Sequence, residues 1–213
     1  LIGIKKKFGH KVIVTGNIIR EEILNFKKNI QFEPGVLNIL VLGGSQAAKS
    51  FGELLPQVFE KCKKESVKIK IFQQCVESQT EKLNKIYKNL NFNFELFNFT
   101  NNITKYFEKT ELAITRSGAS VTAELLNCKI PFISIPYPYS ADSHQEKNAA
   151  YLEGKGYSLT VSEEEVDKKL FPLIKSLYKD RKLLNKIIEK QKKHSDKKVF
   201  LKINRVIEIL KNE

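Results

Sequence analysis

The chain has 213 residues, which is enough for one ordinary domain and a short piece of a second, and its 37 Lys and Arg against 24 Asp and Glu give a formal net charge of +13. No apolar run approaches the roughly 18 residues of a membrane span, so the sequence predicts a soluble or peripheral protein. Cys62, Cys75 and Cys128 are widely spaced, which argues against a disulfide framework or a zinc site and favours a reducing cytoplasm.

The beginning of the chain and its charge allow two further expectations. The chain contains no Met, even at position 1, and Leu1 to Lys7 lacks the order of a signal peptide, so we expect a processed chain or a fragment of a longer one. The excess of Lys favours anionic partners such as acidic lipid surfaces or phosphorylated substrates. The lysines are scattered, however, and abundant Lys, Asn, Ile and Phe beside few Ala and Gly are typical of an AT-rich genome. The absence of a recognisable RNA-binding or DNA-binding motif predicts no nucleic-acid partner.

Strand and helix patterns alternate along most of the chain, because short apolar runs are followed by segments with helical spacing of apolar residues. In chain order, we expect a strand over 36–42, a helix from Phe51 through Phe59, a strand over 67–72, a helix over 80–90, a strand over 94–99, a short helix capped by Asn101 or Asn102 and running through Phe107, a strand over 112–115, a helix over 121–128, a strand over 131–136, a helix over 143–153 that ends at Gly154 or Gly156, a strand over 157–161, and helices over 163–178, 181–192 and 197–211.

Strands separated by helices of this length predict parallel pairing with right-handed crossovers. The expected fold class is therefore α/β, an open parallel Rossmann-like sheet flanked by helices, with a helical carboxy-terminal extension. The order of the strands cannot be read from the pattern. We find no internal repeat and no disordered linker.

Gly43-Gly44-Ser45-Gln46 forms the first loop with a possible chemical role. Glycines let the backbone approach a ligand closely, and the following helix presents unpaired N–H groups and a positive dipole end to phosphate. The loop is neither the dinucleotide GxGxxG nor a P-loop with its Lys. A tight turn without a ligand is the alternative interpretation.

Arg116 to Ala119 forms the second loop and opens a helix that carries Glu124. The amides of its first turn point over the carboxyl edge of the sheet, where ligands of such folds bind. Glu124 lies one turn inside this helix, where a carboxylate can accept hydrogen bonds from two ribose hydroxyls. Alternatively, Glu124 complements the helix dipole.

Tyr137 to Ser143 forms the third loop and leads into a helix with His144, Gln145 and Asn148 near its start. The spacing of four places His144 and Asn148 on one face, and amide groups at a helix start suit sugar hydroxyls. His144 could act as a general base, but the sequence fixes no partner carboxylate, so we favour a positioning or surface role. No GxSxG, HExxH or CxxC motif supports a hydrolase or a metalloenzyme.

These three loops, in this order, resemble the donor-binding half of the MurG family, the two-domain GT-B transferases of glycosyltransferase family 28 that add N-acetylglucosamine to lipid I in bacteria. The resemblance covers nearly the whole chain. The sequence departs from the family at Ala47-Ala48, where a third glycine is typical, at Ile18, where a proline is usual, and at His144, where many members carry Gln.

The resemblance implies roles for single residues. Glu124 matches the residue that binds the ribose of uridine diphosphate, while Phe99 and Thr100 match the place where uracil is held; without the resemblance, Phe99 would be interpreted as core. Arg20 would help to hold the diphosphate or its loop. The predicted substrate-binding residues are Arg20, Gly44, Ser45, Gln46, Phe99, Thr100, Ser117, Gly118, Ala119, Ser120, Val121, Glu124, and the sugar-facing His144, Gln145 and Asn148.

The resemblance further implies a donor-binding domain over 21–213, preceded in 1–20 by the end of a missing acceptor domain and the interdomain junction. The whole enzyme would transfer N-acetylglucosamine from its uridine diphosphate donor to lipid I with inversion, making lipid II for peptidoglycan, without a cofactor or a metal. The missing domain would supply the acceptor site, the general base and contact with an anionic membrane surface, at the cytoplasmic face of the bacterial inner membrane. Catalytic residues of this chain are therefore unknown, and we expect negligible turnover by this chain alone.

Three other interpretations remain open from the sequence. The first is a separate donor subunit that pairs with a membrane-anchored partner, although the junction-like Thr15 to Arg20 argues against it. The second is a related transferase of the macrolide type, with a different sugar. The third is a noncatalytic basic module for nucleic acid or an anionic membrane, which would bind polymers in a salt-sensitive way and ignore uridine nucleotides.

Overall fold

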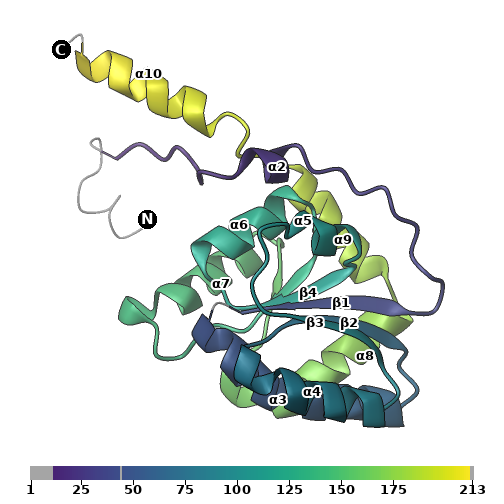
Figure 1. The fold of residues 1–213 in the computed structure, drawn as a ribbon. Coiled ribbons are helices and arrows are strands. Elements are labelled where there is room, and N and C mark those ends of the chain that lie inside the picture. Colours follow the sequence, from purple (N-terminus) through teal and green to yellow (C-terminus); the bar gives the residue numbers. More distant parts are fainter. Residues whose placement is uncertain (1–11, 44, 212–213) are drawn as a thin grey trace.

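The computed structural model describes residues 12–43 and 45–211, with a six-stranded sheet between two layers of helices (Figure 1). In chain order the elements are α2 (Glu21–Leu24), β1 (Leu37–Leu42), α3 (Ser45–Lys64), β2 (Ile69–Gln74), α4 (Glu77–Asn89), β3 (Asn93–Phe97), α5 (Thr104–Glu108), β4 (Leu112–Thr115), α6 (Ala119–Asn127), β5 (Phe132–Ser134), a 3-10 turn (Ala141–Ser143), α7 (His144–Gly154), β6 (Leu159–Thr160), a 3-10 turn (Glu163–Glu165), a π-helical turn (Val166–Leu170), α8 (Phe171–Lys179), α9 (Lys182–Lys192) and α10 (Val199–Lys211).

The strand order is β3-β2-β1-β4-β5-β6, and every neighbouring pair is parallel. This confirms the predicted open parallel sheet and adds the order that the sequence pattern could not provide. The order reverses between β1 and β4, so their two crossovers leave in opposite directions. In open α/β sheets, ligands bind in the crevice beyond the carboxyl ends of the strands at this reversal.

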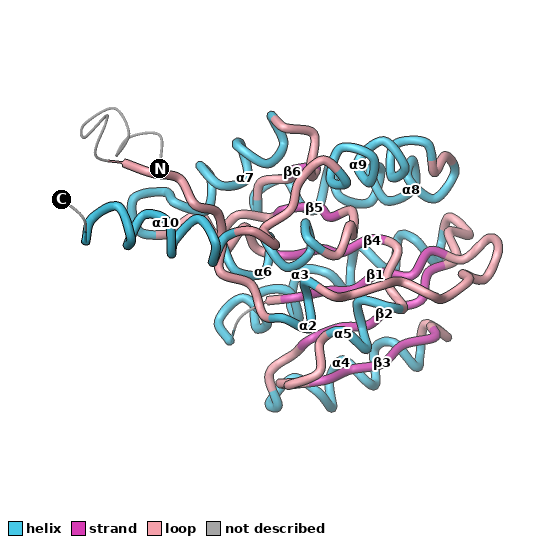
Figure 2. Tube along the Cα trace, turned by 90° about the horizontal axis from the view of Figure 1, so that it is seen from above, coloured by secondary structure: helices cyan, strands magenta, loops and turns pink. Residues whose placement is uncertain are grey.

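Both faces of the sheet are buried, and β1 shows why its sequence is apolar at every position except Asn38. Leu37, Ile39 and Val41 belong to the core under α3, α4 and α8, while Leu40 and Leu42 belong to the core under α2, α5 and α6. Successive side chains of a strand point to opposite faces, so a strand covered on both sides needs apolar residues on both faces instead of an apolar-polar alternation. Figure 2, seen from above, shows the strands side by side beneath the helices of one layer.

The predicted elements are present, with boundary shifts of a few residues, and two local differences stand out. The segment predicted as one helix over 163–178 is a 3-10 turn, then the π-helical turn, then α8. Pro172 explains the change, because it has no N–H to donate to the preceding turn and therefore interrupts the regular hydrogen-bond ladder. The short helix α2 has no counterpart among the predicted elements.

The segment before α2 is tied to the start of α10. Asn17 N donates a hydrogen bond to Asp196 Oδ1 (3.2 Å), and Gly16 adopts φ +115° beside it. A Cβ at Gly16 would lie 2.6 Å from both Asp196 Oδ1 and Val199 Cγ2, so only glycine fits. These contacts fix where the chain enters α2, and hence where Arg20 lies.

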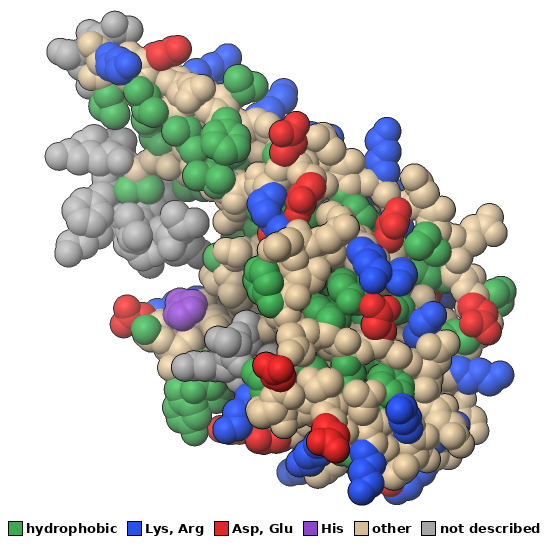
Figure 3. Space-filling view, in the orientation of Figure 1, with side chains coloured by type: hydrophobic (Ala, Val, Ile, Leu, Met, Phe, Trp, Pro, Cys, Tyr) green, Lys and Arg blue, Asp and Glu red, His purple; other side chains and the backbone are tan. Residues whose placement is uncertain are grey.

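Helix α10 extends away from the body of the protein (Figure 1), and its apolar side chains are visible along it in Figure 3. Phe200, Leu201 and Leu210 are more than half exposed. None of the helices in the part of the chain that the structure describes combines the length and the apolar composition of a membrane span.

Candidate functional site

A cleft of about 680 Å³ opens beyond the carboxyl ends of the strands at the reversal of strand order. The loops that follow β1, β3, β4 and β5 surround it, together with Arg20 from the start of α2. Its lining residues are Arg20, Leu42, Gly43, Gln74, Phe97, Phe99, Thr100, Asn101, Ile103, Thr115, Arg116, Gly118, Ala119, Ser120, Val121, Glu124, Tyr137 and Gln145. Nine of the predicted site residues are in this set: Arg20, Phe99, Thr100, Gly118, Ala119, Ser120, Val121, Glu124 and Gln145.

The first turn of α6 presents free amides to the cleft. The first intrahelical bond runs from Thr122 N to Gly118 O (3.2 Å), so the N–H groups of Ala119, Ser120 and Val121 precede it and have no acceptor within the helix. These three residues line the cleft. Because the helix dipole is positive at this end, the turn is suited to an anionic group such as a phosphate.

Glu124 lies one turn further along α6, and its carboxylate is paired with Arg20. Glu124 Oε1 accepts a hydrogen bond from Arg20 Nε (3.1 Å) and forms an ion pair with Arg20 Nη2 (3.0 Å). Arg20 Nη1 also contacts Glu22 Oε1 at 2.8 Å. The Glu124 side chain is 18% exposed and that of Arg20 is 47% exposed, so both remain accessible from the cleft.

Arg116 lines the cleft but serves mainly to join its loops. Its buried guanidinium donates from Nη1 to the carbonyls of Ile135 (3.1 Å) and Pro136 (3.2 Å), and from Nη2 to Ser50 Oγ (3.1 Å). It also forms an ion pair with Glu163. These contacts connect the loop after β4 to β5 and α3, and thereby fix the start of α6.

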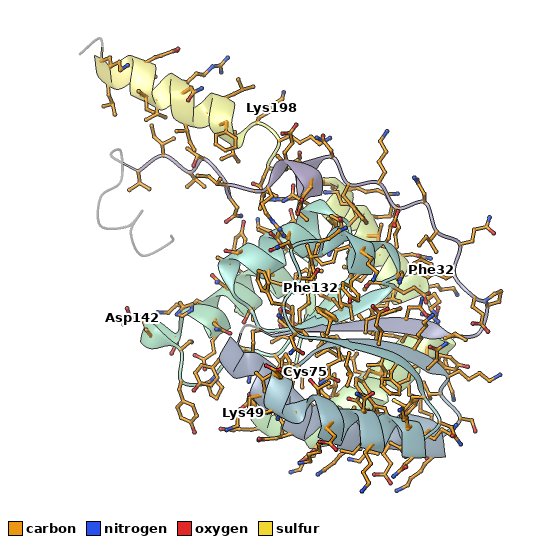
Figure 4. All side chains as sticks on the ribbon, in the orientation of Figure 1. Phe32, Lys49, Cys75, Phe132, Asp142 and Lys198 are labelled. Carbon is orange, nitrogen blue, oxygen red and sulfur yellow. The ribbon has the colours of Figure 1, made fainter. Side chains whose placement is uncertain are left out.

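The three predicted sugar-binding residues are placed differently. Gln145 lines the cleft, and its Oε1 accepts a hydrogen bond from Tyr137 N (3.0 Å). Asn148 Nδ2 donates to the carbonyl of Ser117 (3.0 Å), which joins α7 to the loop after β4. The exposed His144 contacts the carbonyl of Ala141 through Nδ1 (2.8 Å), within its own turn. Figure 4 shows Asp142 of this turn at the outer end of the α7 region.

Phe99 and Thr100 lie in the loop between β3 and α5. Phe99 is 81% exposed and lines the cleft, so the interpretation of this residue as core is wrong. Phe99 follows the end of β3 and lies beyond the packed layers. Phe97, the last residue of β3, instead stacks on Tyr106, with 4.0 Å between the ring centroids. Thr100 Oγ1 accepts a hydrogen bond from Asn102 N (3.0 Å), which shapes the loop. An exposed aromatic ring beside the cleft offers a surface on which a planar ring can stack.

Among the predicted residues of the first loop, Gly44 lies outside the described residues, as do the side chains of Ser45 and Gln46. On either side of this loop, β1 ends at Leu42 and α3 begins at Ser45. Gly43 N donates to Gln74 Oε1 (3.2 Å) and lines the cleft. Gly43, the first residue of this loop, therefore borders the same cleft.

The sequence analysis missed several polar residues of the cleft. Gln74 and Thr115 end β2 and β4, and both line it. Ser117, which was predicted, is buried beside them, and within the described part of the chain the hydroxyls of Thr115 and Ser117 have no hydrogen-bond partner. A polar residue that ends a buried parallel strand is the signal that would have pointed to Gln74 and Thr115.

A second cavity, of about 530 Å³, lies at the other end of α6. Two of the lysines that line it donate hydrogen bonds to backbone carbonyls. Lys129 Nζ donates to the carbonyls of Leu126 (3.2 Å) and His194 (2.7 Å), and Lys28 Nζ donates to that of Thr110. Burial lowers the pKa of Lys28 to about 8, against the opposing charge of Glu111. These ammonium groups stabilise carbonyls at chain turns. In the described segments, no three His, Cys, Asp or Glu side chains are grouped as a metal site requires.

The glycosyltransferase family 28 C-terminal domain model matches residues 38–203. Two curated relatives carry the name UDP-N-acetylglucosamine–N-acetylmuramyl-(pentapeptide) pyrophosphoryl-undecaprenol N-acetylglucosamine transferase. The one from Pelagibacter ubique is 36% identical over 163 residues, which cover 76% of this chain and 45% of the relative. The one from Rickettsia bellii is 35% identical over 204 residues, which cover 84% of this chain and 57% of the relative.

Among solved structures, the chain is similar to MurG of Acinetobacter baumannii, with a TM-score of 0.76 and 26% sequence identity. The match covers 87% of this chain and 54% of that one. The chain thus spans about half the length of the relatives that it matches.

Proposed function

Because the chain belongs to the family of glycosyltransferase family 28 C-terminal domains, we propose that it is the donor-binding half of an inverting transferase that uses UDP-N-acetylglucosamine. The observation that carries this proposal is the arrangement at the cleft: the free amides of α6, the Glu124 carboxylate and the exposed Phe99 ring all line one space. The names of the relatives support the choice of sugar nucleotide.

Each part of the donor has a partner of matching chemistry. The uracil ring stacks on Phe99 and is met by Thr100, while the ribose hydroxyls donate to Glu124. The diphosphate receives the amides of Ala119 to Val121, together with the loop of Gly44, Ser45 and Gln46. The sugar lies toward Gln145, with His144 and Asn148 on the same helix.

The chemical contribution of this half is to hold the donor and to stabilise its leaving group. As the bond between the sugar and the diphosphate breaks, negative charge grows on the diphosphate. Amides that are already aimed at that position need no reorganisation, and a preorganised electrostatic contribution of this kind is commonly the largest in enzyme catalysis. The general base and the acceptor site belong to the remaining half of the longer protein.

For the longer protein, we propose transfer of N-acetylglucosamine to lipid I, which gives lipid II for peptidoglycan, at an anionic membrane surface on the cytoplasmic face of the inner membrane. Residues 21–213 then form the donor domain, and the stretch up to Arg20 belongs to the interdomain junction. The tie between Asn17 and Asp196 supports this division, because it anchors the incoming segment directly beside α10.

Calorimetry tests this proposal, with UDP-N-acetylglucosamine as ligand and UDP-glucose and the Glu124→Gln variant as comparisons. Removing the charged acceptor of two ribose hydroxyls should weaken binding by about 10-fold to 100-fold. Glu189→Gln, on the exposed side of α9, is the matched control and should bind as the wild type does. A folded wild-type protein that ignores uridine nucleotides, or a Glu124→Gln variant that binds as tightly as the wild type, would contradict the proposal.

A further inference from the structure

The lysine-lined cavity at the far end of α6 collects positive charge from three parts of the chain. Lys28 follows α2, Lys129 follows α6, and Lys192 and Lys197 lie at the end of α9 and in its connection to α10. Among the described residues that line this cavity, four are Lys and none is Asp or Glu. The cavity is therefore an electropositive space of about 530 Å³, at the opposite end of α6 from the donor cleft.

Contacts with backbone carbonyls occupy only part of the available donors. An ammonium group has three N–H donors. Lys28 donates to one carbonyl and Lys129 to two. Among the described contacts, Lys197 donates only from its backbone N–H, to Ser195 Oγ (3.3 Å), which leaves its ammonium group with all three donors. Donors thus remain for a ligand that accepts several hydrogen bonds.

Burial makes the positive charge in this cavity costly. It lowers the pKa of Lys28 to about 8 and also lowers the pKa of Lys129. Glu111 opposes the shift at Lys28, but its carboxylate is also paired with Arg181 (3.3 Å). The Cys128 thiol beside it is neutral at pH 7, because burial raises its pKa to about 12. Carbonyl oxygens carry only partial charge, so an anion would stabilise these ammonium groups more than the backbone does.

The size and the remaining lining of the cavity suit an organic anion. Leu24, Phe26 and Ile188 contribute apolar surface beside the lysines. A volume of this size is typical of small-molecule sites, which combine apolar walls with a few polar groups. A phosphate group carries up to two negative charges, and its oxygens can accept from several ammonium groups at once.

We propose that the lysine-lined cavity binds the phosphate group of an organic ligand, at a site separate from the donor cleft. Two sources share this chemistry, a free phosphorylated metabolite and the headgroup of an acidic lipid. The bound phosphate joins the segments that follow α2, α6 and α9, next to the point where α10 leaves the body (Figure 1). If the lysines only neutralise helix ends, phosphate has no more effect there than other salts.

The first experiment is an NMR titration of the 213-residue chain with inorganic phosphate, which replaces chloride at constant ionic strength. The amides of Ile188 and Ser195 report on the lysine-lined cavity, and those of Ala119 to Val121 report on the donor cleft. We expect saturable shifts at Ile188 and Ser195. Shifts there that are no larger with phosphate than with chloride would overturn the proposal.

Three variants identify the site by matched removal of one charge. Lys192→Gln and Lys197→Gln remove exposed lysines that line the cavity, and each should weaken phosphate about threefold. Lys198→Gln is the control, because Lys198 is exposed at the base of α10 and is not among the lining residues (Figure 4). Equal phosphate affinities in all three variants would also overturn the proposal. A failed donor site is distinguishable, since only the amides of Ala119 to Val121 would then ignore UDP.

The pH dependence adds a readout that nonspecific screening does not give. Sulfate is the probe, because it does not titrate near neutral pH. Lys28 loses its proton around pH 8, so sulfate affinity at the cavity should fall about fivefold between pH 7 and pH 9. In Lys28→Met this dependence should be smaller, and thermal unfolding checks that the variant folds. An identical pH dependence in a folded Lys28→Met variant would contradict the role of Lys28.

Glycerol phosphate and short-chain phosphatidylglycerol below its micelle concentration distinguish the two sources. Tighter binding of the lipid at Ile188 and Ser195 assigns the site to acidic headgroups, since the apolar lining then contacts the acyl chains. Tighter binding of glycerol phosphate assigns it to a free metabolite. Binding of neither ligand would contradict an organic phosphate site.

Discussion

Asn148 Nδ2 donates a hydrogen bond to the carbonyl oxygen of Ser117 over 3.0 Å, and this bond joins the helix after β5 to the loop after β4. The two loops come from neighbouring strands and border the cleft together. The positions of the α6 amides and of Gln145 therefore depend on each other through a side chain that does not itself line the cleft.

Replacing Asn148 with Ala should loosen this connection. We expect a loss of about 0.5 to 1.5 kcal/mol in the free energy of unfolding, because one hydrogen bond is removed. The affinity for UDP-N-acetylglucosamine should fall by a larger factor than that for UDP, since the proposed donor site places the sugar nearest to Gln145 and the joined segments. Chemical denaturation and calorimetry measure the two effects, with Asn204→Ala on the exposed face of α10 as control. Equal losses for the two ligands would argue against a role near the sugar.

Tyr87 provides a test of the core that is independent of the cleft. Its side chain is fully buried, and its hydroxyl donates to Gln73 Oε1 at 2.6 Å. Burial raises the pKa of this hydroxyl well above the ordinary value of 10, so it stays protonated as a donor. Tyr87→Phe leaves a buried amide oxygen without this donor and should lower the free energy of unfolding by about 1 to 3 kcal/mol.

Nucleotide affinity should not change in Tyr87→Phe. Tyr139→Phe is the matched control, because Tyr139 is 82% exposed. Denaturation curves for the two variants that coincide would contradict a structural role for the Tyr87 hydroxyl.

The sequence pattern predicted the layered sheet well because its physical causes are local. A run such as 37–42, apolar except at Asn38, needs cover on both faces, and this indicates a buried parallel strand. The order of strands was not accessible, since it depends on pairings such as Ile39 with Leu112, far apart in the chain.

The same limit applies to the site. Glu124 and the amides of α6 are neighbours in sequence and were predicted together. The partner of Glu124 was not, because Arg20 is 104 positions away and reaches it only through the packing of α2 on α6. Phe99 was difficult for a different reason. The apolar pattern predicted a strand over 94–99, whereas β3 ends at Phe97, so the pattern did not reveal that Phe99 lies in the following loop.

Gly16, before α2, and Gly35, before β1, allow the backbone strain of a positive φ to be separated from crowding by neighbouring side chains. Both adopt positive φ, +115° and +76°, but only Gly16 is crowded, whereas a Cβ at Gly35 meets nothing within 4 Å. Gly35→Ala should therefore cost only the backbone term of about 1 to 2 kcal/mol. Gly16→Ala should cost clearly more, because Asp196 and Val199 must also move. Equal unfolding free energies for the two variants would show that crowding by Asp196 and Val199 adds nothing to the cost of the Gly16→Ala substitution.

Asp196 should contribute to stability in a pH-dependent way. Its burial would raise the pKa, but hydrogen bonds from Asn127, His194 and the amide of Asn17 hold the pKa of this carboxyl below its usual 3.8. A pKa that is lower in the folded protein gives stability that is present above about pH 4 and is lost as the pH falls through the folded value.

Asp196→Asn should thus lower stability at pH 7 and flatten the acid limb of the stability profile, without removing it, since other carboxyls contribute. Unfolding free energies measured between pH 7 and pH 3 provide the comparison. A variant whose profile runs parallel to that of the wild type over this range would refute the assignment.

The most direct test of the donor site is a crystal structure of this chain with UDP-N-acetylglucosamine. We predict density in the cleft between β1 and β4, with the ribose hydroxyls on Glu124 and the diphosphate at the amides of Ala119 to Val121. Nucleotide bound elsewhere, for example in the lysine-lined cavity at the far end of α6, or an empty cleft at saturating ligand, would contradict the account.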